Sequence, residues 1–147
     1  GPYRLAHLVL DVNGTLAVDG QLIAGVAERL SDLRQSLEVH TLTADTHGKQ
    51  QAIDAQLGFQ AVRVAQEDQP AQKAAFVHRL GAQSVCAIGN GANDAGMLCE
   101  AKLGIAILGE EGLAGETLTA AHVVSPHINA ALDMLRNPLR LVATLRR

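Results

Sequence analysis

The chain has 147 residues, of which 48% are hydrophobic and 18% charged, a composition typical of one globular domain with a single core. The net charge is −3 and 2% of the residues are aromatic, so neither a basic surface for phosphates nor a stacking platform for bases is expected, and we predict no nucleic-acid partner. No apolar run approaches the roughly 18 residues of a membrane-spanning helix. We therefore expect a cytoplasmic protein without membrane contacts, with a single domain at residues 3–147 after Gly1-Pro2, which we interpret as the remnant of a tag.

Apolar runs alternate with segments of helical periodicity along the chain, which predicts an α/β fold. The first strand is expected at residues 5–12, and residues 16–22 after it are long enough only for a small flap. Apolar side chains at steps of three and four between residues 23 and 37 predict the first helix. Residues 38–43 form the second predicted strand.

The middle of the chain continues the alternation. A helix is predicted at residues 47–57 and ends at Gly58, because glycine tolerates the left-handed conformation common at helix ends. A short strand follows at residues 60–65, and a third helix begins near Pro70, whose missing N–H costs nothing in a first turn. Residues 84–88 form the fourth predicted strand.

The last third of the chain adds further strands and helices to the same pattern. The expected elements are a glycine-rich loop with a short helix at 89–101, strands at 103–108 and 123–124, a helix at 128–135 and another from Pro138 to the C-terminus. Strands and helices in this order predict a doubly wound, three-layer αβα sandwich with a mainly parallel sheet.

Polar residues occur at the ends of several predicted strands and near the start of one helix. Singly, such residues are also typical of helix caps and turns. In an open parallel sheet, however, ligands bind outside the carboxyl ends of the strands where the strand order reverses, so four such groups together favour a ligand site. The groups are Asp11 with Asn13, Thr43 with Asp45, Lys73, and Asn90 with Asn93 and Asp94.

These groups resemble, in order, the four motifs of the haloacid dehalogenase superfamily of phosphotransferases. The resembling segments are DVNGTL at residues 11–16, LTAD at 42–45, Lys73, and GNGANDAGML at 89–98. Within that superfamily the sequence is similar above all to the phosphorylation domain of P-type ion pumps. The two places where relatives insert a cap domain are too short here to hold one, so the resemblance implies a cap-less domain.

The resemblance implies a Mg²⁺-dependent phosphohydrolase in which Asp11 is the nucleophile and forms an aspartyl-phosphate. Phosphoryl transfer also needs fixed donors and a cation for the charge on the transferring oxygens, and Mg²⁺ prefers oxygen ligands. The implied roles are catalysis by Asp11, Asn13, Thr43 and Lys73, phosphate binding by Thr43, Ala44, Lys73 and Asn93, and Mg²⁺ binding by Asp11, Asn13, Asn90 and Asp94.

Two asparagines depart from the superfamily pattern. Asn13 stands where the phosphatases carry a second Asp that acts as general acid and base, and losing such a group typically costs about 10² to 10⁴ in rate. Asn90 stands where a metal-binding Asp is usual, so metal affinity should fall. We therefore expect a slow or specialised phosphatase, and the alternative is a catalytically silent protein that binds metal, phosphate or a protein partner.

Without a cap, the predicted site is open to water. Closure would then come from a phosphorylated substrate that is itself a macromolecule, or from a second copy of the chain in a homo-oligomer.

Other potential metal ligands give weaker signals. Cys86 and Cys99 fit neither a disulfide framework nor the CxxC spacing of a zinc site. No two of the six histidines are four residues apart, so we expect them to be scattered over surfaces and turns.

Overall fold

The structure is a computed structural model that describes residues 4–44, 48–108 and 115–137. Its centre is a six-stranded sheet with the order β5-β4-β1-β6-β7-β8, in which every neighbouring pair is parallel. The strands are β1 (His7–Asp11), β4 (Glu38–Thr43), β5 (Val62–Arg63), β6 (Val85–Gly89), β7 (Leu103–Ile107) and β8 (Val123–Ser125). The chain builds the sheet outward from β1 in one direction and then in the other, so the strand order reverses beside β1.

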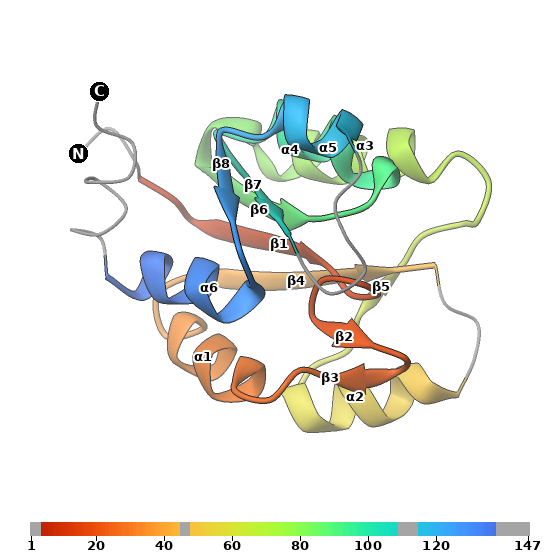
Figure 1. The fold of residues 1–147 in the computed structure, drawn as a ribbon, viewed down its shortest axis with the longest axis vertical. Helices are drawn as coiled ribbons and strands as arrows, with labels where there is room; N and C mark the ends of the chain where they lie inside the picture. The colour runs from red at the N-terminus through yellow and green to blue at the C-terminus, as the bar shows by residue number, and fades with distance from the viewer. Residues whose placement is uncertain (1–3, 45–47, 109–114, 138–147) are drawn as a thin grey trace.

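Helices cover both faces of the sheet, and the predicted three-layer doubly wound sandwich is confirmed (Figure 1). One face carries α1 (Val26–Leu33), α2 (Lys49–Leu57) and α6 (Ile128–Arg136). The other face carries α3 (Gln69–Leu80), α4 (Ala95–Glu100) and α5 (Gly115–Ala120). None of the helices in the described part of the chain has the length and apolar character needed to cross a bilayer.

Each face of the sheet has its own apolar core. On the first face, Leu30 of α1 and Leu132 of α6 belong to one buried cluster with side chains of β1 and β7. On the second, Val77 of α3 and Leu98 of α4 pack with Val9 of β1. The apolar side chains of each helix lie on the side that faces the sheet, where they are buried. This is why the spacing of apolar residues predicted the helices.

The observed elements differ from the predicted ones at β5 and α5. The predicted strand at 60–65 contains only the two-residue β5, and α5 was not predicted, because Gly115 and two threonines give that segment low helix propensity. The predicted flap is a hairpin of β2 (Ala17–Val18) and β3 (Gln21–Leu22). The predicted helix from Pro138 lies outside the described residues. Short 3₁₀ turns, η1 (Ala82–Ser84) and η2 (Ala92–Asp94), precede β6 and α4.

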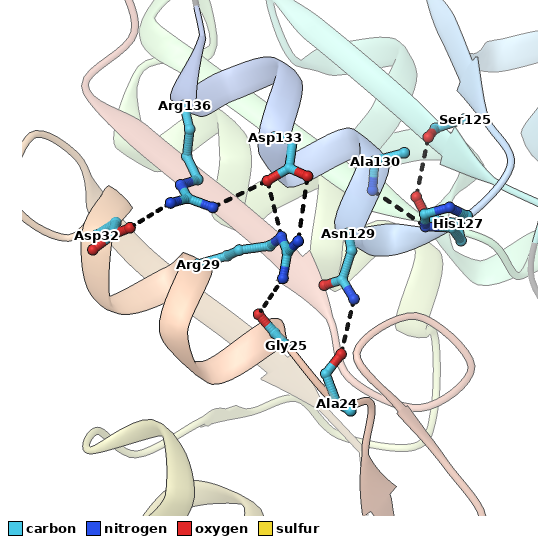
Figure 2. Close-up of polar contacts among 10 residues, drawn as sticks. All are labelled: Ala24, Gly25, Arg29, Asp32, Ser125, His127, Asn129, Ala130, Asp133 and Arg136. Atoms are coloured by element: carbon cyan, nitrogen blue, oxygen red, sulfur yellow. Dashed lines mark hydrogen bonds and ion pairs between the residues drawn. The ribbon is translucent and has the colours of Figure 1, made fainter.

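A polar network joins α1 to α6 although the two helices lie far apart in the sequence (Figure 2). Arg29 donates to both carboxylate oxygens of Asp133, at 2.9 and 3.4 Å, and to the carbonyl oxygen of Gly25 at 3.0 Å. Arg136 bridges Asp133 and Asp32 at 3.1 and 2.7 Å. The hydrogen bond from Arg29 is the main cause that lowers the pKa of Asp133. This network fixes α6 against α1 at the edge of the first core.

We expect Arg29→Met to lower the free energy of unfolding by about 1 to 2 kcal/mol, because it removes a forked, partly buried contact with a carboxylate. The matched variant Arg136→Met should cost less than about 1 kcal/mol, since that side chain is more exposed. Urea denaturation of both variants at pH 7 measures the difference. Equal losses of unfolding free energy in the two variants would show that the two contacts of Arg29 with Asp133 contribute no more than a surface ion pair.

Candidate active site

The turn after β1 holds Asp11 at the carboxyl end of the central strand. Asp11 is the last residue of β1 and is buried. The chain then turns sharply at Gly14, whose φ of 81° is a conformation that favours glycine. The N–H groups of Leu16 and Ala17 both donate to the carbonyl oxygen of Val12, which closes the turn. The carboxylate therefore projects from a well-determined backbone at the point where the strand order reverses.

Lys73 brings two carboxylates together above the sheet edge. Its Nζ lies 2.9 Å from Oδ1 of Asp11 and 2.8 Å from Oδ1 of Asp94. The Lys73 side chain is only 3% exposed, and Lys73 lies one turn of α3 before the buried Val77. A lysine on this inner face of a helix has no access to water, so the two carboxylates take the place of its hydration.

Asp94 is held by its own loop as well as by Lys73. Its Oδ2 accepts hydrogen bonds from the N–H groups of Asn90 and Gly91, both at 3.1 Å. A Cβ atom at Gly89 would lie 2.5 Å from the Asp94 carboxyl group, so the close approach requires glycine there. Thr117 of α5 donates to the carbonyl oxygen of Gly91 and so ties the same loop to the rest of the domain.

Burial dominates the electrostatics of this cluster. Burial, followed by the charge of Asp94, raises the pKa of Asp11 to about 7, and the nearby Lys73 opposes that rise. For Lys73 burial acts to lower the pKa, but the two carboxylates outweigh it and raise the pKa above its ordinary value. Two carboxylates share one ammonium group, so a further cation near Asp11 would be favourable.

The oxygen atoms of residues near Asp11 are of the kinds that bind a hard divalent cation such as Mg²⁺. Asn90 is buried, and its Oδ1 lies 3.3 Å from the Thr15 hydroxyl, which donates to it, whereas Asn13 is exposed. Carboxylate, amide and main-chain carbonyl oxygens are the ligands that Mg²⁺ prefers. Side-chain oxygens of Asp11, Asn90 and Asp94 all accept hydrogen bonds within the site. The metal-binding roles of Asp11, Asn13, Asn90 and Asp94 stay predictions.

The predicted phosphate-binding residues occupy neighbouring positions on the same edge. Thr43 is the buried last residue of β4, whose Leu42 pairs with Asp11, and Ala44 follows it. Asn93 is exposed, and its side-chain amide donates to Gln69 at the start of α3 at 3.2 Å. Asp45 lies outside the described residues. The structure thus brings Asp11, Lys73 and Asp94 into direct contact and leaves Thr43 on the adjacent strand.

Sequence reasoning placed Thr15 and Gly89 within the motif segments at 11–16 and 89–98 but assigned them no role, and it missed Thr117. Thr15 and Asn90 are 75 residues apart, and Thr117 is 26 residues from the carbonyl that it contacts. In a sequence, a glycine at the end of a strand indicates a turn or a close approach of another group. The contacts of Thr15 and Thr117 are between distant segments, so local sequence patterns do not predict them.

A cavity of about 430 Å³ adjoins the turn after Asp11. Thr15 lines it on one side, the β2–β3 hairpin on another, and Ile107, His127 and Asn129 complete the wall. Asp11, Lys73 and Asp94 are not among its lining residues, so the cavity lies next to the turn and is separate from the carboxylate cluster.

Comparison with known proteins agrees with this architecture. No family model matches the sequence. The chain is 45% identical to the uncharacterised protein MJ0073 of Methanocaldococcus jannaschii over 64 residues, which is 44% of this chain and 69% of that protein. It is 36% identical to a probable cation-transporting ATPase G of Mycobacterium tuberculosis over 135 residues, or 88% of this chain, yet it spans only 17% of the length of that ATPase.

Among solved structures, the 3-deoxy-D-manno-octulosonate 8-phosphate phosphatase of Moraxella catarrhalis has the same fold. The TM-score is 0.71 at 17% identity, with 99% of this chain and 95% of that chain covered. No cap domain interrupts the sheet within the residues that the structure describes. The chain belongs to the same family as MJ0073 and, by its fold and its sequence similarity to P-type ATPases, to the haloacid dehalogenase superfamily.

Proposed function

We propose that this chain is a Mg²⁺-dependent phosphohydrolase that acts through an aspartyl-phosphate on Asp11. The observation that carries the proposal is the buried cluster in which Lys73 contacts Asp11 at 2.9 Å and Asp94 at 2.8 Å, at the carboxyl end of the central strand. The fold neighbour named above was crystallised with magnesium and phosphate ions, which supports the same chemistry here.

The proposed reaction has two displacements at phosphorus. In the first, a carboxylate oxygen of Asp11 attacks the phosphoryl group, the bond to the ester oxygen breaks, and the leaving group takes a proton from water. In the second, water attacks the phosphorus of the aspartyl-phosphate, releases inorganic phosphate and restores the Asp11 carboxylate. Bound Mg²⁺ would neutralise charge on the transferring oxygens.

The chain's own residues would divide the remaining work. Lys73 holds Asp11 in place and offsets negative charge, while Thr43, Ala44 and Asn93 are proposed to bind the phosphate oxygens. Asn13 has no proton to exchange, so the leaving group and the attacking water lack a general acid and base. We therefore propose slow turnover, or a substrate whose leaving group needs no protonation.

The proposed substrate is a phosphorylated molecule that reaches an open site. No cap covers the Asp11 cluster in the described part of the chain. A phosphorylated macromolecule, or a second copy of the chain, would then exclude water from the site.

A catalytically silent metal- or phosphate-binding protein is the second candidate, and the paired substitutions Asn13 and Asn90 favour it. Beryllofluoride with Mg²⁺ separates the candidates, because it mimics a phosphoryl group on a carboxylate and requires no turnover. The proposal predicts a rise in Tm with both additives, and no rise in Asp11→Asn. A wild-type Tm that does not change would exclude a phosphorylatable Asp11.

Restoring a carboxyl group at position 13 should speed hydrolysis. We expect Asn13→Asp to raise kcat on an aryl phosphate by about 10²-fold or more, because it supplies the missing acid and base. Asn13→Ala is the matched control, and its kcat should stay near that of the wild type, since the wild-type amide does not exchange protons. An unchanged kcat in Asn13→Asp would show that proton transfer at this position does not limit the reaction.

A further inference from the structure

Two histidines and a glutamate converge at the opposite edge of the sheet, where β1 and β4 begin. In the parallel pairing of these strands His7 lies beside Glu38, and Val9 lies beside His40. Side chains two residues apart on a strand share a face, so all three side chains project to the same side of the sheet. That side is covered by α3. The ring of its Phe76 packs edge-on against the His40 ring, with 5.4 Å between the ring centroids.

The two distances from His7 Nδ1 are close to those between neighbouring ligands of one ion. His7 Nδ1 lies 3.2 Å from His40 Nε2 and 3.5 Å from Glu38 Oε2. The potential ligand atoms of the three residues all lie within 4.8 Å of one another. Around a tetrahedral Zn²⁺ with bonds of roughly 2.0 to 2.2 Å, neighbouring ligand atoms are about 3.3 to 3.5 Å apart.

Hydrogen bonds alone satisfy this cluster poorly. Nδ1 of His7 faces both the His40 nitrogen and the Glu38 oxygen, but a neutral imidazole carries a single proton. If Nδ1 carries that proton, the N–H points to only one of the two acceptors, and if it does not, its lone pair faces the Glu38 carboxylate. A divalent cation accepts a lone pair from all three atoms at once.

We propose that His7, Glu38 and His40 form a binding site for a divalent transition metal, with Zn²⁺ as its ligand and water in the fourth position. Imidazole suits Zn²⁺, whereas Mg²⁺ prefers oxygen ligands, so this site and the Asp11 cluster select different ions. The two lie at opposite ends of β1, about 13 Å apart along the strand. The proposal does not rest on the phosphohydrolase function.

The surroundings favour a site that is open on one side. The His7 side chain is 16% exposed and that of Glu38 is 73% exposed, while His40 is half-buried against Phe76. The imidazoles are thus held by packing, and Glu38 is free to close over an ion that enters from water. Because its ligands come from two adjacent central strands, the ion would hold the start of β1 to β4.

The expectation that the histidines are scattered is therefore wrong for His7 and His40. Strand register, not helical spacing, brings them together across 33 residues. A search for pairs four residues apart detects ligands on one helix and misses ligands on neighbouring strands.

Metal titration of the full chain tests the proposal. After chelator treatment and dialysis, Zn²⁺ is titrated calorimetrically and Co²⁺ is followed by its visible absorption, which is strong for tetrahedral nitrogen and oxygen coordination. We expect one ion per chain at this site and a rise in Tm of about 5 °C or more at Zn²⁺ concentrations well above Kd. The Glu38 side chain is exposed, so Glu38→Gln should fold as the wild type does. We expect it to weaken Zn²⁺ binding at least about tenfold, the lower end of the loss seen when groups around a bound metal are mutated.

Two further variants complete the design. His78→Gln is the matched control and should bind Zn²⁺ as the wild type does. His78 and Glu100 form an exposed pair at 3.2 Å, and no third potential ligand joins them among the described residues. Asp11→Asn should also leave the Co²⁺ absorption unchanged. Binding that is lost in Asp11→Asn but kept in Glu38→Gln would overturn the proposal, as would a wild-type chain that takes up no Zn²⁺.

Discussion

Lys73→Met is expected to lower the free energy of unfolding by about 3 to 5 kcal/mol at pH 8, the range found when one partner of a buried ion pair is removed. The variant leaves Asp11 and Asp94 buried without a cation, although Asp94 keeps the two N–H groups of its loop. Lys49→Met, on an exposed lysine of α2, is the matched control and should change stability by less than about 0.5 kcal/mol.

The loss in Lys73→Met should shrink as the pH falls. With a pKa of about 7, Asp11 is largely protonated in the folded protein at pH 5, so fewer buried charges then depend on the lysine. Urea denaturation of both lysine variants at pH 5 and pH 8 measures this difference. A loss that is small at pH 8, or that grows toward pH 5, would contradict the charge assignment of the cluster.

Asp11→Asn is expected to abolish hydrolysis and to change how the stability of the fold depends on pH. Removal of the nucleophile should reduce kcat at least about 10⁴-fold. Because the wild type is expected to be slow, the comparison is best made in the Asn13→Asp background, with and without Asp11→Asn. Residual hydrolysis above this limit would show that another group attacks the phosphorus.

The stability of Asp11→Asn follows from the raised pKa of the carboxyl group. A folded-state pKa of about 7 lies above the ordinary value of 3.8 for an aspartate, so the folded wild type binds more protons between these values and loses stability as the pH rises through 7. Asparagine does not titrate. The variant's stability relative to the wild type should therefore increase by about 2 kcal/mol from pH 5 to pH 8. A relative stability that stays constant or falls would mean that Asp11 is ionised throughout.

Local sequence patterns predicted the layers of the fold and the strand ends at which Asp11 and Thr43 lie. Periodicity was sufficient because the apolar stripe containing Leu30 and Leu33 is what packs α1 on the sheet. The short helix α5 escaped prediction, since its sequence has weak helix propensity and its Thr117 contributes through tertiary contacts.

The details of the site depend on contacts between distant segments. The order of motifs predicted that Lys73 lies near Asp11, but not that Asp94 turns one oxygen to Lys73 and the other to its own loop. That arrangement depends on the absence of a side chain at Gly89. The pairing of His7 with His40 likewise depends on strand register, which short spacing rules do not describe.

Chemical trapping of the acyl phosphate tests most directly whether Asp11 accepts a phosphoryl group. The full chain is incubated with Mg²⁺ and acetyl phosphate, reduced with borohydride and digested, and the peptides are mapped by mass spectrometry. Borohydride converts an aspartyl-phosphate to homoserine, so the account predicts homoserine at position 11 in the wild type and none there in Asp11→Asn. A wild-type peptide with unmodified aspartate at position 11 would contradict it.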